Sequence, residues 1–405
     1  MTTLVHITTV PVSLWSFLGG QIGYMKDRGF AVRALASPGE YLDRFAEREE
    51  VPVHGVPMLR RITPLRDLVA VGRLWRVLRR VRPAIVHAHT PKGGLLGMIA
   101  ACLTGVPVCI YQVHGMPWMT ARGLKRALLS WTEWAACRLA DQVLCVSGSV
   151  REAAVAGGIC PPAKIKVLAA GSVNGVDAEA RFNPDVAVPA HRDRTRDRLG
   201  IPRSAPVVGF VGRLVRDKGI GELATAWQTL RRLFPALHLL LVGPFEPQDP
   251  VPPEVRALLE NDPRVRLIGQ VDDCLPFYAA MDLVVLPTYR EGLPLVPLEA
   301  AAMSLPVVAT RVPGCVDAVV DGVTGTLVPP RESAALAEAI TAYVRDPELR
   351  RRHGRAGRER VLRDFRPEAV WEALYEEYVR LLRRKGLPVP SPREPAAEEA
   401  EACVS

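Results

Sequence analysis

Short runs of apolar residues alternate with longer helical stretches along almost the whole chain, and this alternation limits the folds open to it. Runs such as VVGFV at 207–211 and LHLLLV at 237–242 are apolar at successive positions, which is typical of parallel strands buried on both faces. Strands that alternate with helices through short loops predict doubly wound α/β units.

The predicted strands fall into two series. They are expected at 4–9, 31–36, 85–89, 106–113, 142–147 and 165–169, and then at 206–211, 237–242, 265–268, 282–287 and 306–310. A chain of 405 residues is long enough for two domains. We therefore expect two facing Rossmann-like domains, at 1–180 and 206–365, with the carboxyl ends of both sheets around one cleft, where ligands bind in open α/β sheets.

Three segments lie outside these series. Residues 181–205 are rich in Arg, Asp and Pro and have no apolar periodicity, so we expect a linker there. Residues 366–384 have the pattern of an amphipathic helix that closes the fold. From 385 to 405 the chain is rich in Pro, Ala and Glu, which predicts a disordered tail.

The net charge of +9 is unevenly distributed. Residues 1–180 carry 21 Lys and Arg against 12 Asp and Glu, whereas the remainder carries 31 of each sign. A basic first half predicts an anionic partner, such as a membrane surface, a phosphorylated substrate or a nucleic acid. The chain has no RNA-binding, zinc-finger or helix-turn-helix pattern, which disfavours nucleic acid. Its oligomeric state is unknown from the sequence.

Two basic segments of the first half have alternative interpretations. A helix expected over 65–81 places Arg73, Arg76 and Arg80 opposite apolar residues. Such a helix either packs on a sheet with a solvated face or contacts an anionic membrane. Between 118 and 139, tryptophans lie near Lys and Arg, and we expect them in the core, with an interface as the alternative.

Eight cysteines are scattered without a C-x-x-C spacing, which argues against a zinc site or a disulfide framework and suits a reducing compartment. The first residues do not have the pattern of a signal peptide, and no apolar run reaches the roughly 18 residues of a spanning helix. We expect a cytoplasmic protein, peripheral at the inner face of the cell membrane.

The most specific loop of the second half is REGLPLVPLEA at 290–300, which follows a predicted strand and opens a helix. The start of such a helix directs free backbone N–H groups and a positive dipole end at an incoming phosphate. Gly292 allows close backbone approach. Glu291 in the loop is placed to hold sugar hydroxyls, and Glu299 within the helix to accept from a ribose diol.

A second loop, GRLVRDKGI at 212–220, carries Arg213 and Lys218. Two cations there would meet the charge of a leaving diphosphate. Lys218 is the only lysine between Lys166 and Lys385 in a chain dominated by arginine, which favours a specific role for its compact charge. The alternative is a solvated loop cation.

Two loops of the first half complete the candidate set. Gly19 and Gly20 follow the first strand and permit close approach to a phosphate, but they do not form G-x-G-x-x-G, which counts against NAD. His114 ends a strand at the expected cleft rim, where it either hydrogen-bonds a reacting sugar or caps a loop. His87 and His89 are expected to be structural.

Taken in order, these motifs resemble glycosyltransferase family 4, the retaining GT-B enzymes. Glu291 and Glu299 match its E-x7-E signature, and the loop at 212–219 matches its G-R-x-x-x-x-K-G element. The segments HTPKGGLLGMIAA, VLCVSGSV, GSVNGVD, PGCVDAVVDGVTG and LVPP resemble its bacterial polysaccharide-building branch. The likeness runs from about residue 3 to about residue 382.

The resemblance implies roles for individual residues. Glu291 and His114 would contact the transferred sugar as catalytic residues. The donor nucleotide sugar would be bound by a set comprising Gly19, Gly20, Arg213, Lys218, Gly292, Leu293, Leu295, Val296 and Glu299. Lys92 and Asn174 would lie on the acceptor side. The family works without a metal or cofactor, and the chain contains no D-x-D motif.

We therefore expect a hexosyl or N-acetylhexosaminyl transferase that uses a nucleotide diphosphate sugar, with UDP as the expected nucleotide. The expected acceptor is a lipid-linked saccharide or a polysaccharide of the cell surface. The basic first half and its amphipathic helix favour a lipid-diphosphate-linked saccharide. Two alternatives remain open at this point: a nucleotide-sugar epimerase of the same fold, and a non-catalytic membrane-docking subunit.

Overall fold

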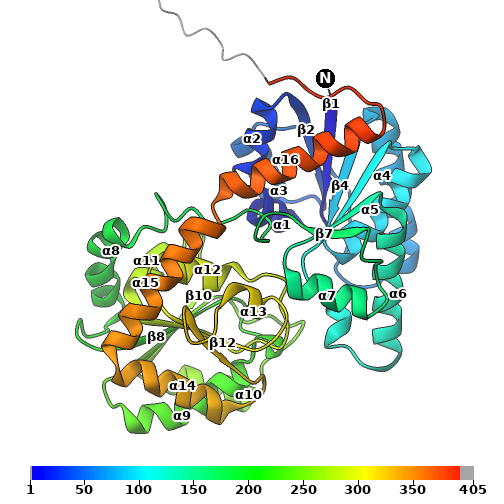
Figure 1. The fold of residues 1–405 in the computed structure, drawn as a ribbon. Helices are drawn as coiled ribbons and strands as arrows, with labels where there is room; N and C mark the ends of the chain where they lie inside the picture. Colours follow the sequence, from blue (N-terminus) through cyan, green and yellow to red (C-terminus); the bar gives the residue numbers. More distant parts are fainter. Residues whose placement is uncertain (1, 393–405) are drawn as a thin grey trace, which may run out of the picture.

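The computed structural model describes residues 2–392, which form two α/β domains (Figure 1). Each domain is built on one sheet, in the orders β3-β2-β1-β4-β5-β6-β7 and β10-β9-β8-β11-β12-β13. The strands are β1 (Thr2–Ile7), β2 (Phe30–Ala36), β3 (Val53–Gly55), β4 (Ile85–His89), β5 (Val108–Val113), β6 (Gln142–Cys145), β7 (Ile165–Val167), β8 (Val207–Val211), β9 (His238–Val242), β10 (Val265–Gly269), β11 (Leu283–Leu286), β12 (Val307–Thr310) and β13 (Gly325–Val328).

Helices connect these strands and cover both faces of each sheet. In the first domain they are α1 (Pro11–Leu18), α2 (Gln21–Asp27), α3 (Glu40–Glu49), α4 (Pro64–Val81), α5 (Pro91–Thr104), the 3₁₀ turn η1 (Pro117–Met119), α6 (Gly123–Leu139) and α7 (Gly148–Ala156). Further along are α8 (Pro184–Leu199), η2 (Arg216–Lys218), α9 (Ile220–Leu233), α10 (Pro253–Asn261), α11 (Leu275–Ala280), α12 (Leu295–Ala302), α13 (Cys315–Ala318), α14 (Ser333–Arg345), α15 (Pro347–Asp364) and α16 (Pro367–Arg384).

All strand pairs within the two sheets are parallel, as the continuous apolar runs predicted. In β4, β5, β8 and β9 every residue is buried. The doubly wound, two-domain architecture is therefore confirmed. All eleven predicted strands are present with small shifts of their ends. The sequence missed β3 and β13, which are edge strands of three and four residues.

Residues 181–205 are not an irregular linker. They contain α8, which packs against α11 of the second domain. The buried side of this helix is held by Arg196, which donates to the Ala280 carbonyl at 2.8 Å and forms an ion pair with Asp282 at 2.9 Å. An arginine fills the position where an apolar residue would reveal a helix, so the segment lacked the periodicity on which the prediction relied.

The closing helix α16 leaves the second domain and lies across the first (Figure 1). Its Tyr378 hydroxyl forms a hydrogen bond with His87 Nδ1 at 2.6 Å, and Glu377 forms an ion pair with Lys166 at 2.7 Å. Residues 385–392 continue along the first domain, where Thr2 donates to the Pro388 carbonyl at 3.2 Å. The rest of the expected tail, 393–405, lies outside the described residues.

Between residues 2 and 392, no helix combines the length and the apolar character that crossing a membrane requires.

The packing of α16 predicts that the first domain depends on this helix for its stability. Leu381 is fully buried in the core that α16 shares with β1, β2 and α2. We expect Leu381→Ala to lower the free energy of unfolding by about 2–4 kcal/mol, measured by denaturant titration. Glu376→Ala, at an exposed position of the same helix, is the control and should change it by less than about 0.5 kcal/mol. Equal changes in the free energy of unfolding for the two variants would contradict the dependence of the first domain on α16.

Candidate active site

The carboxyl ends of the two sheets meet at a junction between two glycine turns. Gly115 follows β5 and lies against Gly292, which follows β11. Ser147, after β6, donates its hydroxyl to the Gly292 carbonyl at 2.7 Å. A Cβ on Gly292 would collide with the His114 carbonyl, so only glycine allows this approach. Loops at the binding edge of both sheets are therefore in direct contact.

A second contact across the junction involves the starts of two helices. Asp317 in α13 accepts from the Ser149 backbone N–H of α7 at 3.1 Å and also from the Ser149 hydroxyl. The Ser149 hydroxyl oxygen accepts in turn from the Gly314 N–H at 2.8 Å. These bonds fix the first domain relative to the segment after β12.

Lys218 and Glu291 lie together at the junction. The Lys218 ammonium is in direct contact with the Glu291 carboxylate, and both side chains are largely buried, at 20% and 12% exposure. Asp217 fastens their two loops to each other. Its carbonyl accepts from the Tyr289 N–H at 2.9 Å, and its carboxylate from Arg290 Nε at 3.0 Å. The two loops predicted from separate motifs thus form one unit.

Glu299 projects from α12 and accepts a hydrogen bond from the Tyr278 hydroxyl at 2.7 Å through Oε2. Burial raises the pKa of its carboxyl above the usual value. The other oxygen, Oε1, has no hydrogen-bond partner in the described part of the chain and is not enclosed by protein. One oxygen orients the carboxylate, and the other is available to accept from a ligand hydroxyl.

The start of α12 presents free backbone donors. The N–H groups of Leu293, Leu295 and Val296 donate to no group of residues 2–392. The first N–H groups of a helix lack partners within the helix and carry the positive end of its dipole. Since Gly292 and Glu291 directly precede them, an anion at this helix start would lie beside the Lys218 ammonium.

Arg213 is arranged differently from Lys218. Its guanidinium forms an ion pair with Glu246, after β9, at 2.7 Å and is half exposed. The structure therefore gives the two predicted cations separate carboxylate partners, and only Lys218 contacts Glu291.

His114 lies at the junction with its ring stacked on Phe17 of α1, at 4.1 Å between ring centroids and an interplanar angle of 11°. Its Nε2 is 3.1 Å from Nδ1 of His89, whose Nε2 is 3.0 Å from Nδ1 of His6. Burial lowers the pKa of His114 to about 3, so the ring is neutral at physiological pH. A neutral imidazole has one donor and one acceptor nitrogen, so it can hydrogen-bond a ligand without adding charge.

The Gly19–Gly20 turn is held from the first domain and from α16. The Asn174 amide donates to the Gly19 carbonyl at 2.7 Å and accepts from the Trp371 indole at 2.6 Å. Gly20 has φ of 77° and packs against the Trp371 ring, where a Cβ would be crowded. Asn174 thus uses both ends of its amide to join the turn to α16, a role other than the expected contact with an acceptor.

Lys92, also expected on the acceptor side, is bound by protein groups. Its ammonium forms an ion pair with Asp67 at 2.7 Å and donates to the Leu59 carbonyl at 2.7 Å. These contacts anchor the segment before α4 to the start of α5. The structure therefore assigns Lys92 a structural contact.

Several residues of the junction were not predicted. Tyr278 orients Glu299, Asp217 joins the two predicted loops, and Ser149 and Asp317 bind each other across the junction, but a single sequence shows no spacing that reveals these pairings. His6, His87 and His89 lie close enough, with ligand atoms within 4.8 Å, to be considered as a metal site. His89 uses both ring nitrogens in hydrogen bonds, and His87 Nδ1 is bonded to the Tyr378 hydroxyl. Within this set, Nε2 of His6 and Nε2 of His87 are the ring nitrogens without a partner among the described residues.

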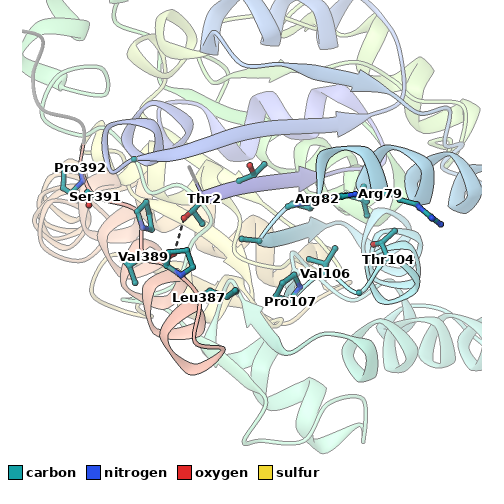
Figure 2. A pocket seen from close by; sticks show the side chains of 18 residues that line it. Thr2, Arg79, Arg82, Thr104, Val106, Pro107, Leu387, Val389, Ser391 and Pro392 are labelled. Atoms are coloured by element: carbon teal, nitrogen blue, oxygen red, sulfur yellow. Dashed lines mark hydrogen bonds between the residues drawn. The ribbon is translucent and has the colours of Figure 1, made fainter.

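A separate pocket of about 890 Å³ lies at the opposite edge of the first sheet (Figure 2). Thr2, Arg79, Arg82 and Val106 line it together with residues 387–392. This edge holds the amino ends of β1, β4 and β5, whereas ligands of open α/β sheets bind at the carboxyl ends. The junction, not this pocket, is the candidate active site.

Comparison with known families agrees with this geometry. A family model described as "Glycosyl transferase 4-like domain" matches residues 15–171, and one described as "Glycosyl transferases group 1" matches residues 205–346. The capsular polysaccharide biosynthesis glycosyltransferase CapM of Staphylococcus aureus is 32% identical over 379 residues, which are 93% of this chain and 97% of CapM.

Two further relatives are informative. A UDP-Gal:α-D-GlcNAc-diphosphoundecaprenol α-1,3-galactosyltransferase of Escherichia coli is 30% identical over 279 residues, 68% of this chain and 69% of that protein. The structure of HepE from Anabaena in complex with UDP and glucose has the same fold, with a TM-score of 0.77, 22% identity and coverage of 94% and 99% of the two chains.

Two family models cover the greater part of each domain, and CapM matches along nearly its whole length. The chain therefore belongs to glycosyltransferase family 4, in the branch that builds bacterial polysaccharides.

Proposed function

We propose that this glycosyltransferase moves a hexosyl or N-acetylhexosaminyl unit from a UDP-linked sugar to a lipid-diphosphate-linked saccharide, with retention of anomeric configuration. The observation that carries the proposal is the contact between Lys218 and Glu291 beside the start of α12, with the His114 turn packed against Gly292. This arrangement places a cation, free helix N–H groups and a sugar-binding carboxylate in one location.

The donor would lie across the start of α12. Its diphosphate would take the Lys218 ammonium and the N–H groups of 293, 295 and 296, and the Glu299 Oε1 would accept from the ribose diol. Arg213 would bind the diphosphate after its ion pair with Glu246 breaks. These groups meet the charge of the diphosphate from the protein itself, so we propose that no metal ion or other cofactor is required.

In the proposed step, the bond between the anomeric carbon and the β-phosphate oxygen breaks as the acceptor oxygen attacks from the same face. The proton of the acceptor hydroxyl passes to the leaving diphosphate. The protein supplies orientation and stabilises the charge that develops on the diphosphate, and it forms no covalent intermediate. Glu291 and His114 hold the transferred sugar in line for this attack.

A lipid-linked acceptor is supported by the surface of the first domain. Helices α4, α5 and α6 lie side by side in the first domain (Figure 1). Leu65 and Leu68 near the start of α4, Leu124 at the start of α6 and Trp131 in the middle of α6 are 60% to 91% exposed, and arginines lie among them. Of the tryptophans expected in the core, only Trp118 is buried there, whereas Trp131 and Trp134 are exposed.

This surface has the composition of a site that inserts apolar side chains between anionic headgroups. The helices begin at the carboxyl edge of the first sheet, the edge that carries His114. A lipid-linked acceptor bound there would present its saccharide towards the junction. The name of the E. coli relative includes a diphosphoundecaprenol acceptor and a UDP-linked donor, which supports both parts of the proposal.

Donor binding is tested by thermal unfolding with UDP-, GDP- and ADP-sugars in the presence of EDTA. A UDP-sugar at about 100 times its Kd should stabilise the protein by about 2.7 kcal/mol, seen as a rise in Tm. Lys218→Ala should weaken binding about 10- to 100-fold, because it removes a charge-assisted hydrogen bond.

Lys125→Ala, at an exposed lysine of α6, is the matched control and should bind like the wild type. A rise in Tm with a GDP- or ADP-sugar alone would replace UDP in the proposal by that nucleotide. A rise in Tm that requires a divalent cation would contradict the metal-independent site. An unchanged Tm with every nucleotide sugar would contradict the proposed function.

Membrane binding is tested by co-sedimentation with vesicles of phosphatidylglycerol and phosphatidylcholine. The double variant Leu65→Glu, Leu68→Glu should bind at least about 10-fold more weakly, since it removes two insertable side chains and adds negative charge. The control is Leu233→Glu, at an exposed leucine of the second domain. If the double variant and the control bind alike, or if a lipid-free acceptor is used as well as the lipid-linked one, the lipid-linked acceptor is ruled out.

A further inference from the structure

Three histidines form a hydrogen-bonded chain from the core of the first domain to the junction. His6 on β1 and His89 on β4 are fully buried, and His114 follows β5. His6 Nδ1 lies 3.0 Å from His89 Nε2, and His89 Nδ1 lies 3.1 Å from His114 Nε2. At the inner end, His6 Nε2 is enclosed without a hydrogen-bond partner among the described residues. At the outer end, His114 Nδ1 is not enclosed.

All three rings are neutral at physiological pH, because burial lowers the pKa of His6 and His114 to about 3 and that of His89 well below its usual value. A neutral imidazole has one N–H donor and one acceptor nitrogen. In each hydrogen bond of the chain, one nitrogen must therefore carry the proton and the other must be bare. The tautomer of one ring thus fixes the tautomers of the other two.

Only two arrangements satisfy both bonds. In the outward arrangement every ring carries its proton on Nδ1, so His6 donates to His89, His89 donates to His114, and His114 presents an N–H at the junction. In the inward arrangement every proton is on Nε2, and His114 presents a lone pair.

The surroundings of His6 Nε2, at the inner end of the chain, decide between the outward and the inward arrangement. The outward arrangement leaves a bare lone pair on the enclosed His6 Nε2, whereas the inward arrangement buries an N–H there without an acceptor. Among buried backbone groups, N–H donors without a partner are rarer than under-satisfied carbonyl acceptors, and leaving a buried polar group unpaired costs about 1–3 kcal/mol. We take the same order of preference to hold for the donor and acceptor forms of the His6 Nε2 atom. The surroundings of His6 therefore favour the outward arrangement.

We propose that His6 and His89 are positioning residues that hold His114 as the Nδ1–H tautomer, so that His114 donates a hydrogen bond to a hydroxyl of the transferred sugar. The stacking of His114 on Phe17 fixes the plane of the ring and hence the direction of that donor. The identity of the ligand rests on the proposed function, whereas the tautomer is a property of the chain alone.

The tautomer is read directly from a two-bond ¹H–¹⁵N correlation spectrum of the full chain labelled at histidine. The His114 signals are assigned by their loss in His114→Asn. We expect a protonated Nδ1 and a bare Nε2 on His114 in the wild type. A protonated Nε2, or a mixture of both tautomers, would overturn the proposal.

Variants at His6 test whether the chain sets this state. His6→Asp places an acceptor-only oxygen where Nδ1 stands, so at pH 8 it should reverse the chain and move the His114 proton to Nε2. His6→Asn retains an N–H donor at that position and should keep the wild-type tautomer. His87→Leu is the control, because His87 stacks on His89 at 4.2 Å but shares no hydrogen bond with the chain. An unchanged tautomer in His6→Asp would contradict the positioning role.

Kinetics with the nucleotide-sugar donor provide the functional readout. His6→Asp should lower kcat/KM for the donor about 5- to 10-fold, the value of one hydrogen bond, while His6→Asn and His87→Leu stay near the wild type. Equal losses in all three variants would indicate a packing defect and overturn the proposal. If no nucleotide sugar is turned over, the proposed function fails, and the spectrum still decides the tautomer.

Discussion

The contact between the His114–Gly115 turn and the Glu291–Gly292 turn is the constraint on which the candidate site depends. It places the loops of two separate sheets within van der Waals distance of each other, and Gly292 is the residue that permits it. Glu291, the carboxylate proposed to bind the sugar, comes from one domain and His114 from the other. Without this contact, each domain carries only half of the groups that the proposed transfer requires.

The two domains are joined by more than the connecting chain. Helix α16 returns from the second domain to the first, and Trp371 at its start packs on Gly20 while it donates to Asn174. The same helix covers the sheet face that contains the histidine chain, through the bond between Tyr378 and His87. The packing that stabilises the first domain thus also fixes the geometry on one side of the active site.

The sequence predicted the fold well because its signals are local. Buried parallel strands such as β8 and β9 are continuous apolar runs, and their period can be read directly. Helix α8 was missed because Arg196 fills its buried side through hydrogen bonds to carbonyl groups. The edge strands β3 and β13 are too short to show a pattern.

For the candidate site, motif spacing marks the charged residues Glu291, Glu299 and Lys218, and the structure brings Lys218 and Glu291 into contact. The sequence did not identify the groups that orient them. Tyr278 and Asp217 act through bonds between segments far apart in the chain, and such pairing appears only in three dimensions. Lys92 and Asn174 show the converse: their polar atoms are used by protein partners that the sequence does not reveal.

The most direct test of the junction is the rate of sugar transfer by Gly292→Ala, measured beside its affinity for UDP. The added methyl group would displace the His114 turn, so we expect a loss in kcat of about 100-fold, with a much smaller change in UDP affinity. Gly72→Ala is the matched control, since a Cβ there meets no other atom within 4 Å. A Gly292→Ala enzyme that transfers sugar at the rate of this control would contradict the claim that the contact of the two turns builds the active site.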